Sequence, residues 1–413
     1  MKKLIPYPLI DTAEQPQINS NLSALGNYIK HDLAITCQFL RLYDDNQATF
    51  LNYRKETERL LHWSWLIAKK SILKLRREDI ENFIKFCQKP LKSWIGIKTV
   101  SRFINKNSKR VPNPEWRPFV ATISKAEVNK GNKPRKDEYI PSQQSIKTTF
   151  VILGSFYTYL INEKLTEINP VLQIRQKSKF LRKQQGAPKV PRLSEVQWKC
   201  LIDTTRKLSD KNPDRHQRTL FIITAMYLMY LRISEFVATS RWTPIMGHFY
   251  KDSNDNWWFI TVGKGNKERH VTVSKGMVSA LKTWRKHLGL SLLPSPQDQF
   301  PLLPKNKGKG AVTSIRMLRH LIQECFNATT QELLKKGEQD EAGTMAMATV
   351  HWLRHTGISD DINKYGRPIL HVRDDAVTQA LRLRTVTTML FYANGILQEK
   401  INKFKKLIEV TLR

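Results

Sequence analysis

The sequence predicts a mainly α-helical protein with a helical N-terminal domain and a mixed α/β C-terminal domain. Three observations support this prediction. Apolar residues recur at helical spacing through most of the 413-residue chain, which is long enough for two or three domains. Two β-prone runs in the second half flank a turn-forming segment, so a small sheet or hairpin is expected there. The composition changes at a basic stretch poor in apolar residues, 178–192, which we predict to be a linker.

The N-terminal half is expected to be helical after a short irregular start. Residues 1–26 are rich in Pro, Asn and Gln and predict a loose lead-in, and the helical domain is assigned to 27–177. The segment "QATFLNYRKETERLLHWSWLIAKK" alternates apolar and basic residues at helical spacing. A second helix, "RREDIENFIKFCQK", carries an apolar stripe formed by Ile80, Phe83, Ile84 and Cys87.

A segment rich in Pro, Asn, Lys and Arg, 102–139, interrupts the helical pattern. Trp116 and Phe119 are interleaved with its cations. The composition predicts a basic loop rather than a packed element. Two interpretations are open: a solvated surface loop, or a segment that contacts a phosphate backbone.

The C-terminal domain is assigned to 193–413. Its first helix follows "LSEVQW", in which Ser194 and Gln197 have the spacing of a capping box. The apolar segment "RHQRTLFIITAMYLMYLRISEF" predicts a buried helix that ends near its last residues. The runs "WWFITV" and "RHVTVS" flank "GKGNKE" and predict a β-hairpin with a basic tip. Helical patterns then continue into an amphipathic tail.

The charge is the strongest indication of a partner. There are 69 Lys and Arg against 36 Asp and Glu, a formal net charge of +33. Such a field attracts polyanions, and nucleic acid is the usual one. The four cysteines have no paired spacing, so we expect no disulfide scaffold or zinc site, and a reducing compartment. No metal, nucleotide or flavin motif is present, so no cofactor is expected. Without a signal-peptide or membrane-span pattern, we expect a cytoplasmic protein with no membrane partner.

Five residues of the C-terminal domain form a pattern that none of them forms alone. His351 and Arg354, in "HWLRHTGISDD", lie three apart and project from one helix face. Arg232 occurs in "LRISE", Lys264 in "GKGNKER" and Tyr392 in "FYANG". Each alone is an ordinary surface or packing residue. In this order, the motifs resemble the tyrosine recombinase (phage integrase) family across the C-terminal domain, and the helical N-terminal domain resembles the family's core-binding domain more loosely.

The resemblance implies a core-binding domain and a catalytic domain that close as a C-shaped clamp on DNA. It implies a site-specific recombinase or integrase that cleaves and rejoins strands through a 3′-phosphotyrosyl intermediate. The implied partners are double-stranded DNA with an inverted-repeat site and three further copies of the chain, as a homo-tetramer on paired sites. It also implies DNA integration as in a mobile genetic element, and a bacterial, nucleoid-associated location. The alternative is a non-catalytic, sequence-specific DNA-binding protein on the same scaffold.

The chemistry of strand cleavage explains this choice of side chains. Two forked guanidinium groups, those of Arg232 and Arg354, neutralise phosphate oxygens as the transition state forms. The Tyr392 oxygen attacks phosphorus and forms a covalent link. Lys264 donates a proton to the leaving 5′ oxygen. His351 accepts the tyrosyl proton or orients the phosphate. The predicted catalytic residues are therefore Arg232, Lys264, His351, Arg354 and Tyr392.

The sequence departs from the family at one position. The family carries a further His or Trp shortly before its tyrosine, and neither occurs in the corresponding stretch here. Arg382, Arg384 or His371 is a candidate replacement. The tail after Tyr392 also has two interpretations, since its apolar stripe either packs on its own domain or docks on a neighbouring protomer.

Overall fold

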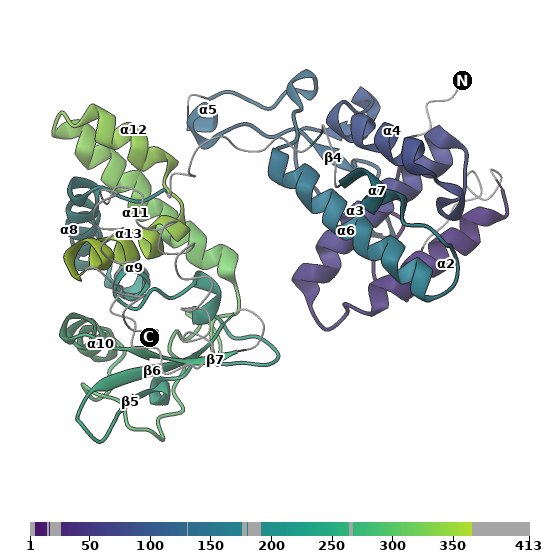
Figure 1. Cartoon of the computed structure of the whole chain (residues 1–413). Coiled ribbons are helices and arrows are strands. Elements are labelled where there is room, and N and C mark those ends of the chain that lie inside the picture. Colours follow the sequence, from purple (N-terminus) through teal and green to yellow (C-terminus); the bar gives the residue numbers. More distant parts are fainter. Residues whose placement is uncertain are drawn as a thin grey trace, which may run out of the picture. The chain divides into compact units, whose positions relative to one another are not determined.

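The computed structural model divides the chain into two compact units, residues 1–183 and 184–413. Each unit has its own buried apolar core. The protein is mainly α-helical, with small sheets in both units (Figure 1). The structure describes residues 5–14, 16, 26–129, 131–175, 180, 191–263 and 267–365. The predicted linker lies almost entirely outside these ranges.

Helices form most of the N-terminal unit. Helix α3 packs against α2 and α6, and α7 packs against α4 and α6. The predicted apolar stripe of α4 is confirmed, because all four of its residues are buried. The helices are α2 (Tyr28–Arg41), α3 (Gln47–Trp63), α4 (Arg77–Gln88), α5 (Lys125–Asn129), α6 (Gln143–Asn162) and α7 (Pro170–Arg175).

The N-terminal segment belongs to this core, so the expectation of a loose lead-in is wrong for its described residues. Leu9 and Ile10 are fully buried. The Leu9 amide donates to the carboxylate of Glu58, and the Arg54 guanidinium donates to the Ile10 carbonyl at 3.3 Å. A Pro- and Asn-rich composition does not exclude an extended segment whose backbone groups are satisfied by side chains of a helix.

The basic segment 102–139 is also packed, contrary to the prediction of a loop. It contains an antiparallel hairpin of β2 (Phe103–Lys106) and β3 (Lys109–Pro112), and β4 (Phe119–Val120), which pairs in parallel with β1 (Ile95–Gly96). The side chains of Phe103, Trp116 and Phe119 are buried. These three aromatic rings, together with the buried Asn113 and Ala121, anchor a segment that is otherwise rich in polar residues.

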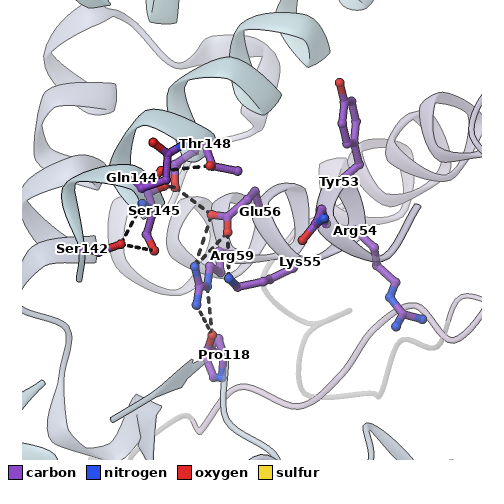
Figure 2. Close-up of polar contacts among 12 residues, drawn as sticks. Tyr53, Arg54, Lys55, Glu56, Arg59, Pro118, Ser142, Gln144, Ser145 and Thr148 are labelled. Carbon is purple, nitrogen blue, oxygen red and sulfur yellow. Dashed lines mark hydrogen bonds and ion pairs between the residues drawn. The ribbon is translucent and has the colours of Figure 1, made fainter. Parts of the chain in front are cut away.

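A buried ionic network joins helix α3 to this segment (Figure 2). Glu56, with 4% of its side chain exposed, pairs with Arg59 at 3.0 Å and accepts a hydrogen bond from Thr149 at 2.9 Å. Arg59 also donates twice to the Pro118 carbonyl, at 2.9 and 2.7 Å, and its guanidinium lies 4.4 Å from the centroid of the Phe119 ring. The network fixes the chain that follows the β2–β3 hairpin against the helices.

The C-terminal unit combines helices with a three-stranded antiparallel sheet, ordered β5-β6-β7. The predicted hairpin is confirmed as β6 and β7, and β5 is an additional strand. The capping box at the start of α8 is confirmed by reciprocal bonds of 3.1 and 2.9 Å between Ser194 and Gln197. The elements are α8 (Glu195–Lys211), α9 (Pro213–Leu228), β5 (Phe249–Lys251), β6 (Trp257–Val262), β7 (Glu268–Thr272), α10 (Lys275–His287), α11 (Ile315–Lys335), α12 (Gln339–Met347) and α13 (Val350–Tyr365).

The long apolar helix of this unit ends earlier than predicted. Helix α9 stops at Leu228, and Tyr230 adopts a left-handed backbone with φ of +52°. A short 3-10 turn, Ile233–Phe236, follows. A left-handed conformation is unfavourable for a bulky residue, so surrounding contacts must hold it.

Two further structural observations concern membranes and metals. Among the residues that the structure describes, no helix is both long and apolar enough to cross a bilayer. Within the same ranges, no group of three or more His, Cys, Asp or Glu side chains is arranged to hold a metal ion. All four cysteines are buried and free.

Candidate active site

Arg232 is held at the exit from α9 by a single carboxylate. Its backbone N–H donates to Oε2 of Glu235 at 2.8 Å, and its Nη1 pairs with Oε1 at 3.2 Å. The glutamate side chain is 2% exposed, whereas that of Arg232 is 40% exposed. The main chain and the guanidinium are therefore fixed together, with one side of the guanidinium open to solvent.

The same carboxylate ties this turn to the sheet. Nη2 of Arg269, on β7, donates to Oε2 of Glu235 at 2.5 Å. One buried negative charge is thus shared by two guanidinium groups, so the cluster keeps an excess of positive charge. A charged group of this kind favours an anionic ligand at its exposed side.

The loop of the β6–β7 hairpin begins directly beside Arg232. A Cβ atom on Gly263 would lie 3.4 Å from Oε1 of Glu235 and 3.6 Å from Nη1 of Arg232, so the backbone passes close to the ion pair. The Gly263 amide donates to the Lys267 carbonyl at 2.8 Å, where the loop leaves and rejoins the two strands. Lys264 follows Gly263 directly in sequence but lies outside the described residues.

Helix α13 brings His351 and Arg354 to the same turn. Gly357 allows its close approach to α9, because a Cβ there would lie 2.0 Å from the Tyr227 carbonyl oxygen. The Arg354 guanidinium donates to the carbonyl of Tyr230, the residue with the left-handed backbone. The Arg354 side chain on α13 thus supports the main chain at the α9 exit, 124 positions earlier in the sequence.

The local electrostatics favour a neutral His351. Partial burial, followed by the positive charges of Arg319, Arg354 and Arg232, lowers the pKa of its imidazole. A histidine that is neutral at pH 7 can accept a proton. The neighbouring His355 is buried more deeply. Burial, together with Arg354 and His351, lowers its pKa to about 4.

Three of the five predicted residues, Arg232, His351 and Arg354, come together in the structure. Lys264 and Tyr392 lie outside the described residues, as do the three candidate replacements His371, Arg382 and Arg384. The segments "LRISE" and "HWLRH" lie close together because of contacts made at Gly357 and Tyr230. The two motifs alone do not indicate these contacts.

The structure adds three residues that the sequence analysis did not single out. Glu235 and Arg269 both lie within quoted motifs, "LRISE" and "GKGNKER", and the three-residue spacing from Arg232 to Glu235 is a usable signal for a capping contact. Arg319 is an exposed residue of α11 that acts on His351. It has no recognisable motif, so only the fold reveals its position.

In comparisons with known proteins, the chain is similar to tyrosine recombinases. The chain is 29% identical to tyrosine recombinase XerD of Rickettsia prowazekii over 164 residues, 38% of this chain and 49% of that protein. It is 24% identical to tyrosine recombinase XerC of Bacillus licheniformis over 226 residues, 54% of this chain and 63% of that protein. The chain therefore spans about half to under two thirds of the length of these curated relatives.

The fold has a counterpart among solved structures. A XerH site-specific recombinase bound to a palindromic difH substrate matches 95% of this chain and 89% of its own, with a TM-score of 0.50 and 13% identity. At this identity the match concerns the fold. No protein-family model matches the chain.

Proposed function

We propose that this protein is a site-specific DNA recombinase. The premise is that the chain belongs to the tyrosine recombinase family. It cleaves and rejoins DNA strands through a 3′-phosphotyrosyl intermediate. The observation that carries the proposal is the convergence of Arg232, His351 and Arg354 at the turn after α9, beside Gly263, which directly precedes Lys264 in the hairpin loop.

Each residue has a distinct role in the proposed reaction. The guanidinium groups of Arg232 and Arg354 bind the non-bridging oxygens of the scissile phosphate and stabilise their charge in the transition state. The Tyr392 oxygen attacks phosphorus, and the bond to the 5′ oxygen breaks. Lys264 gives a proton to that oxygen. His351, whose pKa is lowered by partial burial and by its cationic neighbours, accepts the tyrosyl proton or orients the phosphate.

The proposed partners are double-stranded DNA and further copies of the chain. The net charge of +33 supports an extended polyanion as substrate. We propose a homo-tetramer on two paired inverted-repeat sites, with the N-terminal unit as the core-binding domain. Integration or exchange of a mobile genetic element, in the bacterial cytoplasm and on nucleoid DNA, is the corresponding cellular role.

A suicide DNA substrate, nicked so that cleavage cannot be reversed, tests the proposal. The protein should form an adduct with DNA that survives denaturation, and Tyr392→Phe should abolish the adduct. Tyr365→Phe is the matched control and should retain it. DNA binding without an adduct under any condition would instead support the non-catalytic alternative, which the missing His or Trp before Tyr392 favours.

The role of Lys264 has its own test. Lys264→Ala should cleave ordinary DNA roughly 10²–10⁴-fold more slowly, the usual size of general-acid catalysis. A substrate with sulfur at the 5′ bridging position has a leaving group that needs no proton, so it should recover most of the lost rate. Equal defects on both substrates would contradict a proton-donor role.

A further inference from the structure

The tip of the β2–β3 hairpin in the N-terminal unit is a concentrated, exposed positive charge. All residues from 105 to 110 are exposed, and this stretch, "NKNSKR", contains three cations and no acid. Arg110 pairs with Asp11. Lys106 and Lys109 form no ion pair with any residue that the structure describes. They face each other directly across the two strands.

This arrangement is not the one that best stabilises a free hairpin. Like charges placed opposite each other in an antiparallel pair repel. The two turn residues between them, Asn107 and Ser108, have positive φ angles of +49° and +60°. Asn and Gly are favoured in such a turn, and Ser is not. Repulsion between the lysines is relieved when an anion lies between or beside them.

The base of the hairpin is firmly anchored, so the tip is presented from a fixed support. Arg102 forms an ion pair with Glu58, and its guanidinium lies 4.6 Å from the centroid of the Trp116 ring. The Asn113 amide donates to the Arg102 carbonyl at 2.8 Å, and its side chain donates to the Ser101 carbonyl at 2.7 Å. A preorganised pair of cations loses less entropy on binding than a flexible loop does.

We propose that the β2–β3 hairpin is an additional DNA-binding element, whose tip lysines, Lys106 and Lys109, bind backbone phosphates of duplex DNA. This inference rests on the proposed function, which supplies duplex DNA as the partner. A two-stranded ribbon is narrow enough to approach a DNA groove. Lysine is a point charge suited to phosphates rather than to base edges, so the hairpin contributes affinity and not sequence preference.

The test measures DNA affinity of the full chain as a function of salt. In Lys106→Thr/Lys109→Thr, two charges are lost and threonine, which is favoured in strands, preserves the hairpin. Removing two phosphate contacts should reduce the slope of log K against log salt by about 1.8. Affinity should fall by the same factor, on the order of tenfold, for cognate and unrelated duplexes, because phosphate contacts carry no sequence information.

Two control variants separate a phosphate contact from a general loss of charge or fold. Lys92→Thr/Lys98→Thr removes the same charge from lysines that already pair with Asp137 and Glu115, and should change the slope much less. Lys106→Arg/Lys109→Arg should keep the wild-type slope, whether or not the threonine variant folds. The urea midpoint of the threonine variant should equal or exceed that of the wild type, because like-charge repulsion is removed.

The outcomes also separate this inference from the proposed function. If the wild type forms the covalent adduct but the threonine variant keeps the wild-type salt slope, the hairpin inference is wrong and the recombinase proposal stands. The hairpin inference would also be wrong if the threonine variant and the Lys92→Thr/Lys98→Thr control reduced the salt slope by the same amount. If the wild type binds no duplex DNA at all, both proposals fail.

Discussion

Arg102 in the N-terminal unit and Arg232 in the C-terminal unit each pair with a buried glutamate, but only Arg232 keeps much of its side chain in solvent. The exposed fractions are 16% for Arg102 and 40% for Arg232, while their partners Glu58 and Glu235 are 1% and 2% exposed. Arg102 is enclosed by its carboxylate and a tryptophan ring. Arg232 shares its carboxylate with Arg269 and faces outward.

The comparison shows that two things decide the role of an arginine: how deeply its side chain is buried, and whether it shares its carboxylate partner with another cation. A guanidinium neutralised in the interior contributes to folding, and its removal leaves an unpaired buried charge. A guanidinium that shares one carboxylate and remains exposed can bind a second anion. Arg102 therefore supports the architecture of the N-terminal unit, whereas Arg232 is available to bind an anion at the candidate site.

The largest effect on stability is expected at Glu58. Glu58→Gln removes the charge opposite Arg102 and should lower the free energy of unfolding by about 3–5 kcal/mol, the usual cost of breaking a buried ion pair. Denaturant titration measures this. Glu115→Gln, which breaks an exposed pair with Lys98, is the control and should change the value by less than about 1 kcal/mol. Similar small losses for both variants would remove the contrast between the two units.

The next effect concerns catalysis in the C-terminal unit. Arg232→Ala or Arg354→Ala should lower the rate of strand cleavage by about 10²–10³-fold, because transition-state charge on the phosphate loses a donor. DNA affinity should stay within roughly tenfold, since many other cations contribute to binding. Arg206→Ala changes an exposed arginine of α8 that pairs with Asp203, and should cleave normally. Near wild-type cleavage by either site variant would contradict the proposed phosphate clamp.

A pH effect is expected in the N-terminal unit from His62. Complete burial lowers the pKa of this imidazole to about 3. The unfolded chain, with an ordinary pKa of about 6.5, binds the proton more readily, so stability falls as the pH drops below that value. Between pH 7 and pH 5 the loss from this residue is about 2 kcal/mol.

Denaturant titrations at both pH values of the wild type and His62→Leu test this effect. The variant should lose that part of the pH dependence, whatever its absolute stability. His355 in the C-terminal unit also has a lowered pKa and destabilises the fold in the same direction as the pH falls. Part of the pH dependence should therefore remain in His62→Leu. An unchanged difference between pH 7 and pH 5 in the variant would show that His62 is not responsible.

The smallest effect is expected at Arg319. Arg319→Ala removes one of the charges that lower the pKa of His351, so that pKa should rise. The acid limb of the pH–rate profile for cleavage should then move to higher pH, with a modest loss of rate at pH 7. Arg319→Lys keeps the charge and should restore the wild-type profile. A shift of the acid limb to lower pH, or none, would exclude an electrostatic role for Arg319.

Local sequence was sufficient for features that depend on neighbouring residues. The stripe of α4, the capping box between Ser194 and Gln197 and the β6–β7 hairpin were all predicted correctly. Helical periodicity, a three-residue cap and a turn between β-prone runs each need only a few consecutive positions. The same holds for the spacing of His351 and Arg354 on one helix face.

Tertiary structure decided the features that depend on residues far apart in sequence. Composition predicted a loose lead-in and a basic loop, but Leu9 is buried beside Glu58, and the loop is anchored around Trp116. In both segments a few buried residues stand among many polar ones. The average composition of a segment therefore does not reveal which of its residues are buried.

The candidate site shows the same division between sequence and tertiary structure. The sequence by itself determined which side chains are available for phosphate chemistry: two arginines and a histidine at motif spacing. Only the fold decided that they meet, through the contact of Gly357 with Tyr227 and the bond from Arg354 to Tyr230. The physical reason is that close packing of two helices depends on the shape of both surfaces, which no single segment of the chain specifies.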